Sequence, residues 1–279
     1  MKSYRIGLYE KALPDTLTWK EKLIAAKEIG YDYIEMSIDA SDEKIARVFM
    51  NKKERQTLLN DMYEADLPIR SMSVSALTKY ALGDEDEAIR EKGLSIGINA
   101  IILAADLGIR TVMIPGYDIY YGESTLKTKA YFLENMRKLV DTARIHGVIL
   151  GFETMENDFM NTTGKAMKYI TLLQSPYMKI YPDTGNLTNA AYDHKHDVCE
   201  DLCLGEGHLI ALHLKESLPN IYREVPFGSG HVDFERLIKT AWKLGIRRFV
   251  TELWYLGEED YHKTIQDAFN QMTQILDKQ

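Results

Sequence analysis

Four side chains of types that commonly ligate metal ions each follow an apolar run of the sequence. They are Glu153, Asp183, His213 and Glu252. The first two gaps between them are 30 residues each, and the third is 39 residues. One strand-plus-helix unit takes roughly 30 residues, so each candidate falls at the end of a successive strand. In a parallel barrel such positions converge at one mouth, which is where these barrels carry out catalysis. The spacing therefore predicts a metal-dependent enzyme.

The donor set of these four residues indicates a particular chemistry. Three carboxylates and one imidazole suit one divalent cation, with Zn²⁺ or Mn²⁺ favoured. A cation bound to a carbonyl and a neighbouring hydroxyl acidifies the adjacent C–H bond, and a carboxylate can then remove that proton to leave an enediolate. We hypothesise that Glu153 and Glu252 lie on opposite faces of the substrate, so that one removes a proton, the other returns one, and the carbon centre is inverted.

Each of the four residues also has a simpler interpretation when taken alone. A glutamate after a strand is often solvated, and Asp183 could close an Asx-turn. A histidine on an apolar strand is more often a hydrogen-bonded core residue than a ligand. Their common level in the inferred barrel favours ligation over these alternatives.

The elements that must position these residues follow from apolar periodicity and turn residues, which predict eight strands alternating with eight helices. The strands are expected at 4–9, 31–38, 67–75, 109–116, 148–153, 178–182, 209–213 and 246–254. The helices are expected at 17–29, 52–65, 85–107, 125–146, 163–173, 197–204, 233–244 and 259–276. Thr16 or Thr18 is the expected cap of the first helix, and Gly30 ends it. Such alternation implies parallel strands with helical crossovers. We predict that residues 1–279 form one α/β domain, a (β/α)8 TIM barrel, with a doubly wound sheet as the alternative.

A candidate phosphate loop follows the seventh predicted strand. The turn Gly228-Ser229-Gly230 would let backbone N–H groups approach an anion, and this loop is a frequent phosphate site in barrels. Arg223 could supply a planar fork to the phosphate and Lys215 a point charge. An ordinary turn before a helix accounts for the same residues equally well.

Composition and charge narrow the class of protein. The 279 residues are 45% hydrophobic and 27% charged, which is ordinary for a globular protein. The net charge of −8 argues against a nucleic-acid partner. The sequence shows no signal peptide at its start and no apolar stretch of membrane-spanning length, so we expect a cytoplasmic protein without a membrane partner. Cys199 and Cys203 are expected to be reduced thiols, and a homodimer is compatible with a barrel of this size.

The sequence resembles the L-ribulose-5-phosphate 3-epimerases, also called L-xylulose-5-phosphate 3-epimerases, of the xylose-isomerase-like barrel superfamily. The matching segments run in order along nearly the whole chain. They are GLYEKALP (7–14), GYDYIEMSID (30–39), SMSVSA (71–76), PGYDIYYGES (115–124), YPDTGNLT (181–188), GHLIALHLKES (207–217), REVPFGSGHVDFERL (223–237) and TELW (251–254).

The resemblance implies an isomerase that interconverts L-ribulose 5-phosphate and L-xylulose 5-phosphate by inverting C3, in the breakdown of L-ascorbate or a related sugar. Its partner would be a phosphorylated ketopentose. The family's metal ligands fall on Glu153, Asp183, His213 and Glu252, and its acid/base pair falls on the two glutamates. The chain departs from the family at Glu216, where aspartate is usual, and in a longer segment around His194 and His196, which we expect to be solvated loop histidines.

Other functions remain open at this stage. Another metal-dependent ketose or ketose-phosphate epimerase, an aldose–ketose isomerase or a polyol dehydratase would use a similar site. A multinuclear endonuclease is disfavoured by only seven histidines and a net charge of −8. A non-enzymatic sugar-phosphate binder would need the phosphate loop but not the paired glutamates.

Overall fold

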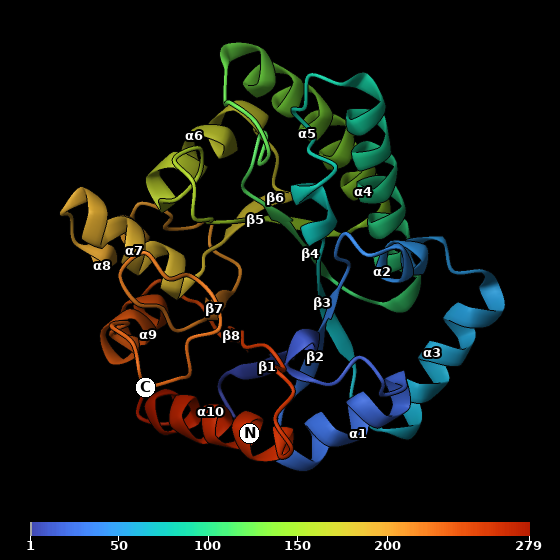
Figure 1. Cartoon of the computed structure of the whole chain (residues 1–279), viewed down its shortest axis with the longest axis vertical. Helices are drawn as coiled ribbons and strands as arrows, with labels where there is room; N and C mark the ends of the chain where they lie inside the picture. Colours follow the sequence, from blue (N-terminus) through green and yellow to red (C-terminus); the bar gives the residue numbers. More distant parts are fainter. Residues whose placement is uncertain (1) are drawn as a thin grey trace.

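The computed structural model describes residues 2–279 and shows eight parallel strands in a ring that is surrounded by helices (Figure 1). Seven of the strands lie within segments predicted as strands, and β7 extends one residue beyond its predicted segment. The strands are β1 (Arg5–Tyr9), β2 (Tyr33–Ser37), β3 (Ile69–Ser73), β4 (Thr111–Pro115), β5 (Ile149–Glu153), β6 (Met178–Tyr181), β7 (Leu212–Leu214) and β8 (Arg248–Thr251). The first strand, β1, pairs with β2 and also with the last strand, β8, so the two ends of the chain meet in the sheet and the sheet curves into a barrel. The barrel prediction is confirmed, and the doubly wound alternative is wrong.

The ring closes between β6 and β7 through isolated bridges rather than a continuous ladder. Ile180 pairs with Leu209, and Asp183 pairs with His213. Pro182 lies between the two bridges and has no N–H to donate, so a regular ladder cannot continue through it. Its carbonyl accepts from the His213 N–H at 2.9 Å. This closure brings Asp183 and His213, two of the predicted ligands, to one level of the barrel.

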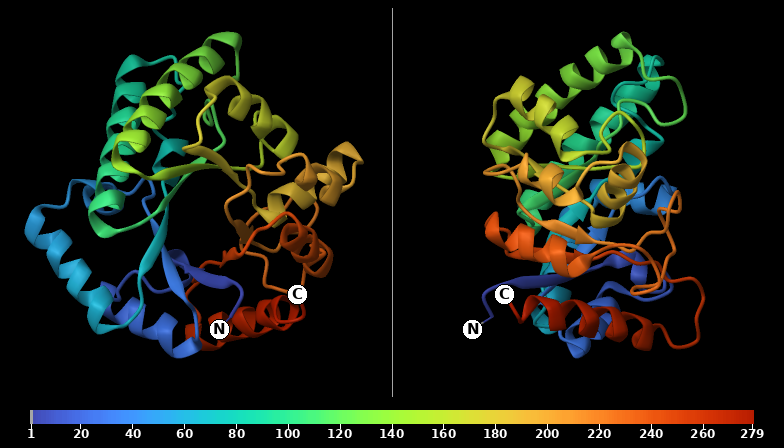
Figure 2. Two further views of the ribbon diagram at one scale, coloured as in Figure 1. Left: turned by 180° about the vertical axis from the view of Figure 1, so that it is seen from behind. Right: turned by 90° about the vertical axis from the view of Figure 1, so that its left-hand side faces the viewer.

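Ten α-helices form the outer layer of the part of the chain that the structure describes (Figure 2). They are α1 (Trp19–Ile29), α2 (Asp42–Ala46), α3 (Lys52–Glu64), α4 (Glu87–Leu107), α5 (Leu126–His146), α6 (Thr163–Leu173), α7 (Thr184–His194), α8 (Val198–Cys203), α9 (Phe234–Lys243) and α10 (Tyr261–Leu276). The predicted number of eight helices is wrong. The two additional helices are α2, which has only five residues, and α7, which begins directly after Asp183, a residue interpreted as a ligand or a turn residue. Ser41 and Asp183 cap these two helices by accepting from backbone N–H groups.

Local signals in the sequence set several helix ends. Thr18, one of the two predicted caps, begins α1 and forms a reciprocal capping box with Glu21. Gly30 ends that helix with φ of 113°, a left-handed conformation that glycine adopts without a steric penalty. Within residues 2–279, none of the helices combines the length and apolar character that a membrane crossing requires.

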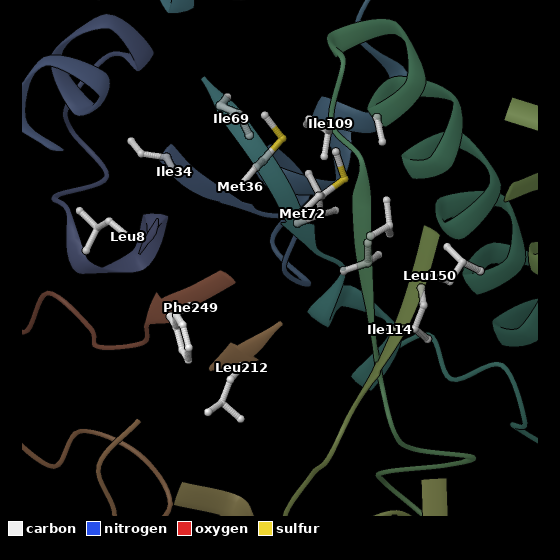
Figure 3. Packing of buried hydrophobic residues seen from close by; sticks show 14 of the residues in the cluster. Leu8, Ile34, Met36, Ile69, Met72, Ile109, Ile114, Leu150, Leu212 and Phe249 are labelled. Atoms are coloured by element: carbon white, nitrogen blue, oxygen red, sulfur yellow. The ribbon is translucent and has the colours of Figure 1, made fainter. Parts of the chain in front are cut away.

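Successive side chains along the strands point alternately into two hydrophobic cores. Leu8, Ile34 and Met36 belong to the large cluster between the strands and the helices, part of which is drawn in Figure 3. Tyr9 and Tyr33 belong to a smaller cluster that also includes Met113, Tyr181, Ala211 and Val250. Because successive strand residues face opposite sides, the second cluster fills the inside of the barrel. Side chains at the carboxyl ends of the strands stand above that packed interior.

Candidate metal centre

The four predicted ligands meet at the carboxyl end of the barrel. One potential donor atom from each of Glu153, Asp183, His213 and Glu252 lies within 4.8 Å of the others. Glu153 is the last residue of β5, Asp183 is the N-cap of α7, His213 lies in β7, and Glu252 directly follows β8. Asp183 and His213 are fully buried, and the two glutamates are 5% and 7% exposed. Four consecutive strands therefore deliver three carboxylates and an imidazole to one point.

The two carboxylate oxygens of Asp183 differ in their contacts: one accepts a hydrogen bond that begins a helix, and the other accepts none from the described part of the chain. Its Oδ1 accepts from the Asn186 N–H at 2.6 Å, which begins α7. Its own N–H donates to Thr154 Oγ1 at 3.0 Å and fixes the backbone. Oδ2 is buried and has no hydrogen-bond partner within residues 2–279. A buried carboxylate oxygen without a partner is costly, and a cation at the centre would satisfy it.

His213 is held so that one ring nitrogen faces the centre. Its Nδ1 lies 2.7 Å from Glu252 Oε2, 3.7 Å from Glu153 Oε1 and 4.0 Å from Asp183 Oδ2. Its Nε2 lies 2.5 Å from Oε1 of the fully buried Glu35. A proton on Nε2, donated to Glu35, leaves the Nδ1 lone pair free for a metal ion, which is the usual arrangement for histidine ligands.

Glu35 is the functional residue that the sequence analysis missed. Its second oxygen, Oε2, accepts from the Tyr181 hydroxyl at 3.0 Å, so both of its carboxylate oxygens have partners. The available signal was an acidic residue inside an apolar strand, β2, every residue of which is buried. The partner could not be inferred, because Glu35 and His213 are 178 residues apart in the sequence.

Lys215, predicted as a phosphate contact, lies at the metal centre instead. Its Nζ is 3.1 Å from Asp183 Oδ1 and 2.9 Å from Asn186 Oδ1, and 4.0 Å from Glu252 Oε2. The side chain is only 5% exposed. The ammonium group therefore offsets part of the negative charge of the cluster, and its contact with a substrate phosphate stays a prediction.

Burial and neighbouring charges shift the pKa values of the three carboxylates in the cluster. Burial and the neighbouring Glu252 raise the pKa of Glu153 well above its usual range. Burial likewise raises the pKa of Asp183, to about 7, although Lys215 opposes that shift. Burial also acts to raise the pKa of Glu252, but Lys215 and His213 outweigh it and hold that pKa low. Without a cation, the three carboxylates do not all ionise readily.

These observations fit a divalent cation. The donor set of three carboxylates and one imidazole is a combination that zinc and manganese accept. A cation would satisfy Asp183 Oδ2 and would reverse the repulsion that raises the pKa of Glu153. Glu35 supplies the outer carboxylate that orients a histidine ligand. The buried cluster could therefore hold a divalent metal ion.

Arg223 lies outside the cluster in the loop after β7. Its Nη2 lies 3.1 Å from Glu156 Oε1, and its side chain is 53% exposed. Glu156 also accepts from the hydroxyl of Tyr117. Burial acts to lower the pKa of Arg223, but Glu156 and, more weakly, Glu252 raise it. The guanidinium thus lies in electrostatic range of the centre with part of its surface open to solvent.

Backbone N–H groups in and just after the glycine turn of the predicted phosphate loop donate to a carboxylate of the protein itself. Gly228 N–H donates to Glu216 Oε2 at 3.1 Å, and Val232 N–H donates to Glu216 Oε1 at 3.1 Å. Ser229 N–H donates to the Pro226 carbonyl. A phosphate role for Gly228, Ser229 and Gly230 stays a prediction, one that would require the Gly228 amide to exchange Glu216 for the substrate.

His194 and His196 lie outside the metal cluster. His194 ends α7, where its Nε2 is 3.3 Å from Asn161 Nδ2 and 3.5 Å from Asp158 Oδ1. The two imidazole rings stack with centroids 6.2 Å apart. His194 is exposed, as expected, but it ends a helix rather than lying in a loop, and Nε2 of His196 is buried rather than solvated.

Comparison with known proteins relates this geometry to other chains. Residues 23–274 match the family model described as xylose isomerase-like TIM barrel. The L-ribulose-5-phosphate 3-epimerase of Shigella boydii serotype 18 is 39% identical over 260 residues, covering 93% of this chain and 90% of the relative. The same enzyme from Escherichia coli O157:H7 is also 39% identical over the same shares of both chains.

Solved structures share the fold at much lower sequence identity. A 3-keto-D-glucoside 4-epimerase from Escherichia coli has a TM-score of 0.78 and 18% identity, covering 97% of this chain and 99% of that one. An L-ribulose 3-epimerase has a TM-score of 0.78 and 17% identity, covering 99% of this chain and 95% of that one. A D-psicose 3-epimerase has a TM-score of 0.79 and 15% identity, covering 98% and 99%.

Proposed function

This chain belongs to the L-ribulose-5-phosphate 3-epimerases of the xylose isomerase-like TIM barrel family, and we propose that it interconverts L-ribulose 5-phosphate and L-xylulose 5-phosphate by inverting C3. The observation on which this proposal rests is that Glu153, Asp183, His213 and Glu252 converge on one point. The chain that contains them is 39% identical to L-ribulose-5-phosphate 3-epimerases. Identity at this level over nearly the whole length supports the reaction class, and the ligand cluster supplies a place for it.

We propose that Glu153, Asp183, His213 and Glu252 hold one divalent cation, with Zn²⁺ or Mn²⁺ preferred by the donor set. When bound, the cation supplies Lewis acidity that polarises the ketose carbonyl and acidifies the adjacent C–H bond. Glu35 fixes the ring of His213, and Lys215 lowers the negative charge of the cluster. The burial of all four ligands keeps bulk water from competing with the substrate oxygens.

The two glutamates are the proposed acid/base pair. Glu153 ends β5 and Glu252 follows β8, so they approach the centre from different sides of the ring. One carboxylate accepts the proton as the C3–H bond breaks, and the electron pair moves into the C2–C3 bond of the substrate enediolate. The other glutamate, protonated, then donates its proton to the opposite face of C3. The reverse reaction exchanges the two roles, and no external oxidant or reductant is needed.

Arg223 is the proposed contact for the substrate phosphate. It is a planar donor that suits a phosphate group, and its present partner is the single carboxylate of Glu156. Exchange of that carboxylate for a dianionic phosphate would leave Glu156 hydrogen-bonded to Tyr117. A cytoplasmic location, a homodimeric state and a role in L-ascorbate breakdown stay predictions. The first rests on the sequence signals described above, the second on the size of the barrel, and the third on the resemblance alone.

Proton NMR in D2O tests the reaction directly. Metal-restored protein incubated with L-ribulose 5-phosphate should produce L-xylulose 5-phosphate and replace the C3 proton by deuterium. Protein freed of metal by exhaustive chelation should do neither. Exchange at C1 with formation of an aldose would identify an aldose–ketose isomerase instead. Binding of the sugar phosphate with no exchange by metal-restored protein would identify a binding protein and refute the proposal.

A further inference from the structure

A second cavity lies at the amino end of the barrel, on the side opposite the metal centre. It has a volume of about 490 Å³ and is lined by Arg5, Lys27, Arg70, Arg110 and Arg248, with Asp32 and Asp66 as its acidic residues. We call these seven residues the basic mouth. Five positive side chains face two negative ones, although the chain as a whole carries a net charge of −8.

Three of the arginines in the basic mouth have no carboxylate partner. Arg5 Nη1 lies 3.1 Å from Asp32 Oδ1, and Lys27 Nζ lies 2.6 Å from Asp66 Oδ2. These contacts use both acidic side chains of the basic mouth. Within residues 2–279, by contrast, the guanidinium groups of Arg70, Arg110 and Arg248 make no ion pair and no side-chain hydrogen bond.

The strand register places the four arginines as two pairs. Arg5 of β1 lies directly opposite Arg248 of β8. Arg110 immediately precedes the β4 residue that pairs with Ser71, and Arg70 immediately precedes Ser71 in β3. Neighbouring strands lie about 4.8 Å apart, so the two arginines of each pair start from neighbouring backbone positions at the rim of one cavity. Strand β2, which carries neither pair, lies between β1 and β3.

Two arginines on facing positions of neighbouring strands repel each other unless a negative charge lies nearby. Like charges on facing positions of neighbouring strands lower stability, and only Arg5 of the four arginines has a carboxylate to offset the repulsion. Two adjacent guanidinium forks are, however, well suited to a phosphate group, which accepts several hydrogen bonds in one plane. The arrangement therefore resembles an anion site more than a set of separately solvated surface charges.

We propose that the basic mouth binds a small anion that carries two phosphate groups, one on each arginine pair. The site is distinct from the metal centre, because Tyr33, Tyr181 and Val250 pack inside the barrel between the two ends. A nucleic acid is disfavoured, since it requires an extended basic surface and the positive charge here is gathered around one cavity. The inference goes beyond the proposed epimerase activity and does not depend on it.

Isothermal titration of the metal-loaded protein with adenosine 3′,5′-bisphosphate tests the proposal. This probe carries two separated phosphates and does not strip metal as a polyphosphate would. Wild-type protein should bind it saturably at 0.15 M salt. The double variant R110Q/R248Q should bind at least about tenfold more weakly, which corresponds to about 1.4 kcal/mol, because it removes one charged donor from each arginine pair. Its epimerase activity should be unchanged.

Two control variants distinguish binding at the basic mouth from binding elsewhere on the protein. Arg137→Gln removes an exposed arginine on the outer helix α5, and Arg223→Gln removes the proposed substrate-phosphate contact. Both should bind the probe as the wild type does. The proposal is overturned by absence of saturable binding, by equal weakening in Arg137→Gln, or by weakening in Arg223→Gln alone, which would place the probe in the active site.

Melting experiments without and with the bisphosphate provide a second test that does not rely on the double variant folding well. Arg248→Gln alone should raise the melting temperature slightly, because it removes a like-charge contact with Arg5. The bisphosphate should raise the melting temperature of the wild type more than that of this variant. An equal rise in both proteins would contradict the assignment.

Discussion

The substitution Glu35→Gln tests whether this buried carboxylate orients a metal ligand. Glutamine has nearly the same volume, so the packing of β2 should survive. Its amide oxygen can accept from His213 Nε2, and its amide nitrogen can donate to the Tyr181 hydroxyl. No buried polar group is therefore left without a partner, and the melting temperature of the metal-free protein should change little. What is lost is the negative charge on the acceptor, 2.5 Å from the imidazole.

The expected loss in metal affinity follows from that charge. A hydrogen bond to a charged group contributes about 1.5–3 kcal/mol, whereas a neutral one contributes about 0.5–1.5 kcal/mol. The difference, about 1–2 kcal/mol, should weaken metal binding roughly 5- to 30-fold. Removal of such outer partners elsewhere typically costs about 10- to 100-fold. Tyr181→Phe, which removes only the bond to Glu35 Oε2, should have a smaller effect in the same direction.

Competition with a chromophoric chelator measures the metal dissociation constant of each variant. Activity of Glu35→Gln should be low at limiting metal and should recover at saturating metal, which a general folding defect would not do. Glu91→Gln, an exposed residue of α4, serves as the control and should match the wild type. Wild-type metal affinity in Glu35→Gln would refute the role assigned to this residue.

Three other perturbations test the catalytic pair, the buried carboxylate and the phosphate contact. Glu153→Gln and Glu252→Gln should each lower kcat by about 10²- to 10⁴-fold in an NMR epimerisation assay, and near-normal turnover in either would contradict the two-base scheme. Burial raises the pKa of Asp183 from 3.8 to about 7, so folded metal-free protein binds an extra proton between these values. Its calorimetric stability should therefore fall as pH rises from about 4 to 7; an increase would argue against this shift. Arg223→Gln should raise KM for L-ribulose 5-phosphate about tenfold but not KM for L-ribulose, whereas Arg236→Gln, with similar exposure and one carboxylate partner, should change neither.

The barrel could be predicted from the sequence because its signals are local. Apolar runs, the Thr18 cap and terminal glycines such as Gly30 each act over a few residues, and all of them agree with a strand–helix alternation. The helix α7 was missed for a local reason as well. Asp183 was interpreted as a ligand or a turn residue, and the structure shows that it is a ligand candidate and a helix cap at once, with one oxygen for each role.

The sequence alone was enough to predict that the four candidate metal ligands come together, since a parallel barrel brings the carboxyl ends of all its strands to one mouth. Position along the chain therefore translated directly into position in space for Glu153, Asp183, His213 and Glu252. Only the tertiary structure showed that Glu35 contacts His213 and that Lys215 lies against Asp183 in the cluster. The tertiary structure also showed that the arginines of the basic mouth line one cavity. Those contacts depend on which side chains meet across the closed ring, and residues up to 178 positions apart in the chain carry no local pattern that specifies such a meeting.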